Sequence, residues 1–248
     1  MNELIKQNIT KWLNGSFDDA VKNEIKKMQQ NGGEELADAF YRNLEFGTGG
    51  LRGIMGVGTN RMNKYTVGMA TQGYANYLSK SFPGQEIKVA IAHDSRNKSR
   101  FFAETVANVF AANGFTVFLF EELRPTPELS FTIRHLGCQG GVVCTASHNP
   151  KEYNGYKAYW VDGGQLVPPH DKAVIAEVEK INDVSDVKWS GGEANIKLIG
   201  KEIDEAYIHM LKTLSVYPEV IHEQKDLKFI RHFSFHPDFF RSRLISKS

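Results

Sequence analysis

Long apolar runs, cysteine and an excess of either charge are all scarce in this sequence. Its 248 residues include 30 Lys or Arg and 29 Asp or Glu, which leaves a formal net charge of +1. That balance argues against a nucleic-acid or membrane-surface protein, because both classes usually carry a cationic excess or patch. No apolar run approaches the roughly 18 residues of a membrane span, and residues 1–10 lack the pattern of a signal peptide. We therefore expect a soluble, cytoplasmic protein.

Cysteine is limited to Cys138 and Cys144, which form no Cys-x-x-Cys pair. One lies beside a predicted buried strand and the other within it. Buried, reduced thiols are therefore expected, rather than a disulfide or a metal site.

From residue 87 the sequence alternates between short apolar runs and helix-like stretches. The apolar runs at 87–92, 115–120 and 141–146 predict buried strands. Helices are predicted at 100–113 and 128–136, each followed by a glycine that can end it. Strands that alternate with helices imply parallel neighbours joined by right-handed crossovers.

Further elements flank this alternating core. Residues 156–161 should add an antiparallel strand that makes the sheet mixed. Helical patterns extend through four other regions, which are 3–44, 63–82, 168–182 and 203–214. The fold class expected is a three-layer α/β/α arrangement with a mixed, mainly parallel sheet.

Three polar loops leave the carboxyl ends of the predicted parallel strands, at residues 93–96, 121–127 and 147–150. Ligands of open α/β sheets bind beyond these ends. Within the first loop we expect Asp94 and Arg96 to pair with each other in a structural role.

The most informative loop contains Ser147, in the stretch GGVVCTASHNPKEYNGYKAYW at residues 140–160. The serine follows a buried strand. Asn149-Pro150 forces an extended or turn backbone, and Asn154-Gly155 is a strong turn signal. One hydroxyl is thus expected at the edge between a strand and a loop.

Cationic residues surround this hydroxyl in the sequence. A phosphorylated serine carries roughly −1.5 to −2 charge and needs cations and amide donors. His148, Lys151 and Lys157 can supply the cations. A polar surface loop without a function is the other interpretation of the same residues.

A second unusual segment, residues 47–58, holds six glycines in twelve positions and includes Arg52. Glycines let the backbone approach an anion closely and expose its amide groups. No dinucleotide or P-loop pattern can be read through it. Taken alone, the segment predicts a turn-rich connection as readily as a phosphate site.

Together these segments carry a family resemblance. TASHNP at 145–150, followed by NGYK at 154–157, resembles the phosphoserine loop of the α-D-phosphohexomutases, the phosphoglucomutase and phosphomannomutase superfamily. GTGGLRG at 47–53 resembles a second family segment in the expected order. Residues 156–172 resemble the branch of longer phosphoglucomutases and phosphopentomutases, and RPTP at 124–127 resembles a segment that shapes the active-site wall. The resemblance covers roughly residues 35 to 230.

The resemblance implies the first domain of a four-domain enzyme. Residues 1–44 would be a helical lead-in, 45–200 the domain with the phosphoserine loop, and 201–230 the start of a second domain with a strand from 227. Residues 231–248 are aromatic and basic and lack the family's T-P-x-H-G-T-G-like continuation. We interpret them as an atypical tail that arose by truncation or a shifted reading frame.

The resemblance also implies roles for single residues. Ser147 would carry the phosphoryl group, and Gly49 stands where many relatives have serine. The residues with an implied catalytic role are Ser147, His148, Lys157 and Arg52. The residues implied to bind the substrate or its phosphate are Thr48, Gly49, Arg52, Asn149 and Lys157. Mg²⁺ would bind Ser147 through its phosphate, but the family's other metal ligands lie in a D-G-D-G-D-R loop, and no D-x-D-x-D occurs here.

The implied function is a phosphohexomutase that interconverts a sugar 1-phosphate and a sugar 6-phosphate through a phosphoserine and a sugar 1,6-bisphosphate. We expect little or no turnover by this chain alone, because the metal loop and later domains are missing. The alternative is a non-catalytic α/β module that binds phosphate or a partner. A serine hydrolase is disfavoured, since no G-x-S-x-G surrounds Ser147. The sequence does not indicate which sugar is preferred or the oligomeric state.

Overall fold

A computed structural model describes residues 2–31, 33–47 and 49–223. Residues up to Ile208 form one compact unit, and the residues from His209 belong to a second unit. The described part of the second unit contains the end of one helix and a short helix, α9 (Pro218–Glu223). The predicted strand at 227–230 and the tail at 231–248 lie outside the described residues.

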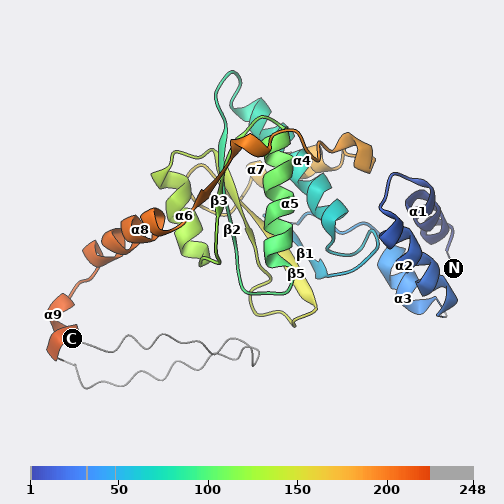
Figure 1. Ribbon diagram of the computed structural model, residues 1–248, viewed down its shortest axis with the longest axis horizontal. Helices are drawn as coiled ribbons and strands as arrows, with labels where there is room; N and C mark the ends of the chain where they lie inside the picture. The colour runs from blue at the N-terminus through green and yellow to red at the C-terminus, as the bar shows by residue number, and fades with distance from the viewer. Residues whose placement is uncertain (1, 32, 48, 224–248) are drawn as a thin grey trace. The chain divides into compact units, whose positions relative to one another are not determined.

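The first unit is built around a six-stranded sheet (Figure 1). The strands are β1 (Gly50–Ile54), β2 (Lys88–His93), β3 (Thr116–Phe120), β4 (Gly140–Cys144), β5 (Tyr153–Trp160) and β6 (Ile196–Ile199). Their order is β1-β5-β4-β2-β3-β6. Strands β4, β2, β3 and β6 are parallel, whereas β5 is antiparallel to both β4 and β1. The predicted mixed, mainly parallel sheet is confirmed.

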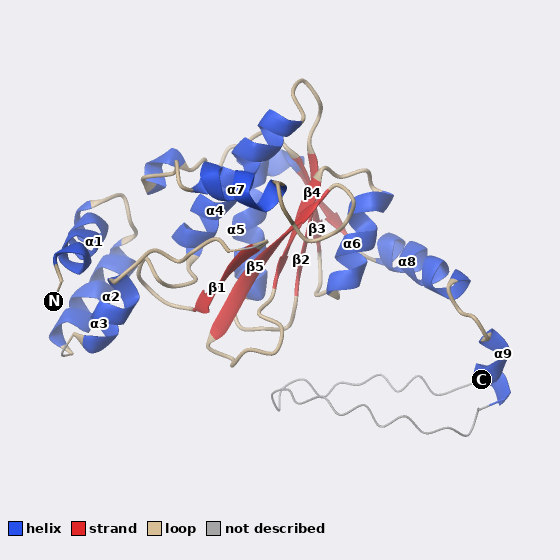
Figure 2. Ribbon diagram, turned by 180° about the vertical axis from the view of Figure 1, so that it is seen from behind, coloured by secondary structure: helices blue, strands red, loops and turns tan. Residues whose placement is uncertain are grey.

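Helices cover both faces of this sheet (Figure 2). The helices are α1 (Glu3–Asn14), α2 (Asp19–Gln30), α3 (Glu34–Phe40), α4 (Lys64–Ser81), α5 (Ser99–Ala112), α6 (Thr126–His135), α7 (His170–Val178) and α8 (Lys201–Thr213). Helices α4, α5 and α7 bury apolar side chains against one face, and α6 and the start of α8 bury theirs against the other. Alternate residues of the strands enter the two cores, because successive side chains of a strand point to opposite faces. The three-layer α/β/α prediction is therefore confirmed.

The first three helices form an aromatic cluster with the start of α4. Trp12 stacks on Phe17 with ring centroids 4.3 Å apart, and both rings pack edge-on against Tyr65 of α4. Phe40 of α3 belongs to the same cluster and packs edge-on against Trp12. This buried aromatic surface packs the helical lead-in against the sheet domain.

The structure differs from the sequence predictions of secondary structure in three places. Strand β1 lies inside the glycine-rich segment that was expected to be a loop, because its backbone pairs with β5. Strand β6 was not predicted, since four residues at a sheet edge give almost no pattern. Asn154-Gly155 lies within β5 rather than in a turn, because the Asn154 side chain is completely buried and hydrogen-bonded.

Candidate functional site

The carboxyl ends of the parallel strands bring the three predicted loops to one edge of the sheet. Strands β2, β3 and β4 end at His93, Phe120 and Cys144. The backbone N–H of Arg124, in the loop after β3, donates to the carbonyl oxygen of His93 over 3.1 Å. Ligands of open α/β sheets bind beyond this edge.

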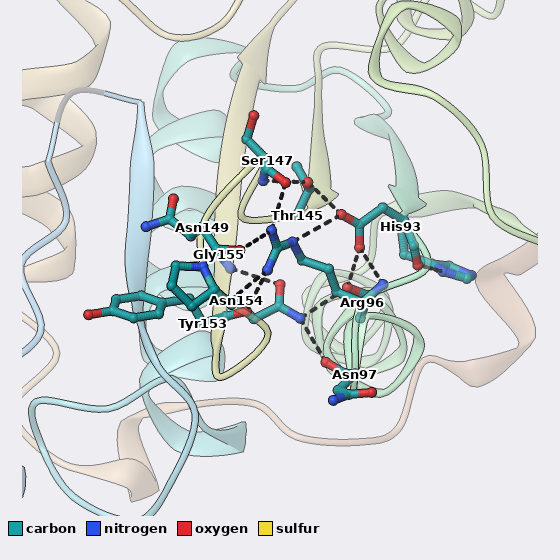
Figure 3. Close-up of polar contacts among 12 residues, drawn as sticks. His93, Arg96, Asn97, Thr145, Ser147, Asn149, Tyr153, Asn154 and Gly155 are labelled. Atoms are coloured by element: carbon teal, nitrogen blue, oxygen red, sulfur yellow. Dashed lines mark hydrogen bonds and ion pairs between the residues drawn. The ribbon is translucent and has the colours of Figure 1, made fainter. Parts of the chain in front are cut away.

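Among the described residues other than glycine, Lys98 before α5 and Ser147 after β4 have a left-handed backbone, and Ser147 is the one in the predicted phosphoserine loop. Its φ is +57°, in the left-handed region, and its side chain is exposed. A residue other than glycine in this region costs on the order of 1–3 kcal/mol unless its surroundings compensate, and such residues concentrate at functional sites. The Ser147 N–H donates to Thr145 Oγ1 over 3.1 Å, which ties the serine to the end of β4 (Figure 3).

Asp94 organises the neighbouring polar groups. Its Oδ2 accepts from Thr145 Oγ1 over 2.6 Å, and its Oδ1 accepts from Ser99 Oγ over 2.6 Å and from the Arg96 N–H over 3.0 Å. Arg96 Nε lies 3.7 Å from Asp94 Oδ2. The predicted pairing of Asp94 with Arg96 is confirmed. The carboxylate thereby links the loop after β2 to the loop after β4.

Arg96 contacts the Ser147 loop through four backbone carbonyl groups. Its Nη2 donates to the carbonyl oxygens of Ser147 and Asn149, each over 2.6 Å. Its Nη1 donates to the carbonyl oxygens of Pro150 and Tyr153, over 3.0 and 3.2 Å (Figure 3). The guanidinium therefore lies at the centre of the loop, with the side chain only 7% exposed.

Asn154 and Gly155 fix the other end of the loop. Asn154 Nδ2 donates to the Asn97 carbonyl oxygen and to Ser99 Oγ, both over 3.0 Å, and its Oδ1 accepts the Gly155 N–H over 2.7 Å. A Cβ at position 155 would come within 2.6 Å of the Thr145 carbonyl oxygen. Glycine is thus required where β5 approaches the end of β4.

Arg52 and Lys157 lie on neighbouring strands beside this loop. Arg52 of β1 is paired with Gly155 of β5, and the Thr145 N–H donates to the Gly155 carbonyl oxygen over 3.0 Å. Lys157 follows Gly155 by two residues and therefore shares a sheet face with Arg52. Neither side chain forms a hydrogen bond or ion pair with any residue that the structure describes. Two cations are thus available on one face near Ser147.

The other predicted site residues differ from one another in exposure and in distance from the Ser147 loop. His148 is exposed next to Ser147, and Asn149 is half-buried with its Oδ1 unpaired among the described residues. Gly49 accepts the Ala158 N–H over 2.8 Å, which places it beside β5 and farther than Arg52 from the Ser147 loop. Thr48 lies outside the described residues.

Sequence reasoning assigned no functional role to Arg96, Thr145 or Asn154, although all three position the Ser147 loop. The signal for Arg96 was the polar D-S-R segment directly after β2, whereas Thr145 and Asn154 stand within the TASHNP and NGYK segments. Among the described residues, no three or more His, Cys, Asp or Glu side chains form a group that could bind a metal ion. Both oxygens of Asp94 accept hydrogen bonds within the loop network.

A buried carboxyl group, Glu128, and a partly exposed one, Asp204, lie beside the loop after β3. Arg124 donates to both oxygens of Asp204 over 2.5 and 2.8 Å, and Glu128 is 4% exposed. Burial, followed by its hydrogen bond to Asp204, raises the pKa of Glu128 to about 7. Burial acts to raise the pKa of Asp204 too, but hydrogen bonds from Arg124 and Glu128 outweigh it and lower that pKa.

This pair predicts a pH-dependent stability. Below about pH 4.5 Glu128 is protonated in both the folded and the unfolded chain; between about 4.5 and 7 only the folded chain retains the proton. The free energy of unfolding should therefore fall as pH rises through this window, and the loss is complete above it. In Glu128→Gln this contribution is absent. Urea unfolding of the wild type and of Glu128→Gln at pH 5 and pH 8 tests this prediction. It would be contradicted if the difference in free energy of unfolding between the two proteins were the same at both pH values.

No helix in the described part of the chain has the length and apolar character needed to span a membrane.

Comparisons with known proteins agree with this architecture. Residues 43–185 match the model of the family "Phosphoglucomutase/phosphomannomutase, alpha/beta/alpha domain I". Human phosphopentomutase is 35% identical to this chain, and the match covers 94% of this chain and 40% of the human protein. Staphylococcus aureus phosphoglucomutase is also 35% identical, and that match covers 83% of this chain and 37% of the bacterial protein. A solved Thermus thermophilus protein assigned as a phosphomannomutase superimposes with a TM-score of 0.58 and 29% identity, over 69% of this chain and 36% of its own.

The chain thus spans about two fifths of the length of these curated relatives. The matched family segment includes β1 to β5 and the loop with Ser147. The family match accounts for more than half of the sequence and for the observed three-layer fold. The chain therefore belongs to the phosphoglucomutase/phosphomannomutase family and carries its α/β/α domain I.

Proposed function

We propose that this chain accepts a phosphoryl group on Ser147 and is the phosphoserine domain of a phosphohexomutase, an intramolecular phosphotransferase that interconverts a sugar 1-phosphate and a sugar 6-phosphate. The observation that carries the proposal is the backbone of Ser147, an exposed serine in the left-handed region at the carboxyl edge of the sheet. Hydrogen bonds to Thr145 and Arg96 maintain that strained conformation.

In the proposed reaction, Ser147 Oγ attacks one phosphorus of a sugar 1,6-bisphosphate. A new Oγ–P bond forms and the P–O bond to the sugar breaks, with the electron pair moving to the sugar oxygen. The serine proton leaves and the sugar oxygen gains a proton, which gives a sugar monophosphate and phosphoserine. Such transfer depends mainly on alignment and on cations near the phosphoryl oxygens.

The remaining predicted residues have proposed roles in this transfer. Arg52 and Lys157 lie on one sheet face next to the loop and are proposed to bind phosphoryl oxygens. Lys157 is further proposed to transfer a proton to the sugar oxygen. His148, Asn149, Gly49 and Thr48 are proposed as further contacts of the phosphosugar.

Mg²⁺ is proposed to bind the phosphate of Ser147. Magnesium prefers carboxylate, phosphate and water oxygens in octahedral geometry. The described residues near Ser147 do not fit a complete site, since both oxygens of the nearby Asp94 carboxylate already accept hydrogen bonds and no group of three or more His, Cys, Asp or Glu side chains that could bind a metal ion is found among the described residues. We therefore propose that the other metal ligands come from outside this chain, and that the chain alone has little or no mutase turnover.

A half-reaction assay tests this function. The chain is incubated with a molar excess of glucose 1,6-bisphosphate and Mg²⁺, and released glucose monophosphate is quantified over time. We expect a single burst of no more than one monophosphate per chain, and no conversion of glucose 1-phosphate to glucose 6-phosphate. Sustained turnover would contradict the proposal that the chain alone has little or no mutase activity. If no monophosphate is released, the alternative of a non-catalytic phosphate- or partner-binding module is favoured.

A further inference from the structure

The buried guanidinium of Arg96 is the feature that the proposed reaction leaves unexplained. Its side chain is 7% exposed, and Asp94, its acidic neighbour, lies 3.7 Å from Nε rather than in a bidentate pair. Arg96 Nε has no hydrogen-bond partner among the described residues. The terminal nitrogens instead donate to four carbonyl groups between Ser147 and Tyr153.

These contacts fix the direction of the peptide groups in the loop. In a trans peptide the C=O and the next N–H point in opposite directions. Because the Ser147 carbonyl points to Arg96, the His148 N–H points away from it. The same holds for the Lys151 N–H, which follows the Pro150 carbonyl. Loop amides that point outward in this way can donate to an anion.

The same contacts stabilise the strained backbone of Ser147. Four carbonyl dipoles that converge on one point repel each other unless a cation lies between them. Without the guanidinium these partly exposed carbonyl groups would lose the donor that they share and that holds them together. The loop would then relax, and Ser147 would leave its φ of +57°.

We propose that Arg96 is a positioning residue for phosphoryl transfer, which aligns the Ser147 hydroxyl by fixing the carbonyl groups of its own loop. Arg96 acts through the loop and does not contact the phosphosugar. Asp94 orients Arg96 and Thr145 together. The inference rests on the proposed function, because it needs Ser147 to accept a phosphoryl group.

The test compares Arg96→Lys with the matched variant Arg100→Lys. A lysine keeps the charge but lacks the planar fork that reaches several carbonyl groups at once. Arg100, in the first turn of α5, also donates to backbone carbonyls, those of Phe120 and Glu121, but it does not contact the Ser147 loop. The rate of phosphoryl gain from glucose 1,6-bisphosphate with Mg²⁺ is followed by intact mass for each protein.

We expect Arg96→Lys to slow phosphoryl gain by about 10- to 100-fold, the size of effect that a displacement of about 1 Å produces. The half-saturating concentration of glucose 1,6-bisphosphate should stay unchanged, because Arg96 does not bind it. Arg100→Lys should behave as the wild type. Equal rates of phosphoryl gain for Arg96→Lys and the wild type would overturn the proposal. A change in the half-saturating concentration of glucose 1,6-bisphosphate, with an unchanged maximal rate, would overturn it as well.

Hydrogen exchange separates this inference from the proposed function. Amides of residues 147–153 should exchange faster in Arg96→Lys, while those of β2 and α5 should not change. Faster loop exchange combined with a wild type that gains no phosphoryl group would refute the proposed function and leave Arg96 a structural role only. Faster exchange throughout the domain would show that Arg96 stabilises the fold generally, which also overturns the proposal.

Discussion

Replacing Ser147 with alanine is expected to abolish phosphoryl gain from glucose 1,6-bisphosphate. The change removes the only atom, Oγ, to which the proposed reaction attaches phosphorus. Stability should change little, since the Ser147 side chain is exposed and its loop contacts are made by backbone groups. Intact mass spectrometry after incubation with the bisphosphate and Mg²⁺ measures the gain directly.

The matched control for this experiment is Ser190→Ala. Ser190 is also exposed but lies in the segment between α7 and β6, away from the carboxyl edge of the sheet. This variant should gain one phosphoryl group at the wild-type rate. A phosphoryl gain by Ser147→Ala equal to that of the wild type would show that another residue is the acceptor.

The second large effect is expected on stability, from Gly50→Ala. Gly50 has a φ of +151°, and a Cβ at this position would clash with the carbonyl oxygen of Tyr156 in β5. Backbone strain and overpacking each cost about 1–3 kcal/mol. The melting temperature should therefore fall by on the order of 10 °C. Because Arg52 lies on the same strand, phosphoryl gain should fall as well.

Gly56→Ala is the control for the same glycine-rich segment. A Cβ at Gly56 would meet its nearest neighbour, the Arg61 side chain, at 3.7 Å, which is an ordinary contact, and its φ is not positive. Thermal unfolding of Gly56→Ala should resemble that of the wild type. If Gly50→Ala and Gly56→Ala melt at the same temperature, the pairing of β1 with β5 does not have the geometry described here.

The alternating core could be predicted from the sequence because burial imposes a local pattern. Buried strands such as the one at 87–92 are short apolar runs between polar stretches, and amphipathic helices such as 100–113 repeat at the helical spacing, so element type follows from a short window. Strand β1 has no such period. Gly50 is explained by the close approach of Tyr156, a residue more than 100 positions later, and no local pattern contains that information.

In the candidate site, too, residues with a local sequence pattern could be predicted and residues positioned by distant partners could not. Ser147 and its lysines could be identified because they stand in one continuous motif after a buried strand. The role of Arg96 could not be identified from the sequence, because its partners lie more than 50 positions away. These partners are backbone carbonyl groups, which have no sequence signature. Asn154 was misread for a related reason. Its turn-forming tendency is overridden by burial against Asn97 and Ser99.

The most direct test of the account is to locate the phosphoryl group after exposure of the wild-type chain to glucose 1,6-bisphosphate with Mg²⁺. Proteolysis and tandem mass spectrometry identify the modified residue in the peptide that spans the loop. The account predicts phosphoserine at position 147, and no phosphate on Ser95 in the adjoining loop or on Ser99 at the start of α5. Phosphate on any other residue, or on none, would contradict it.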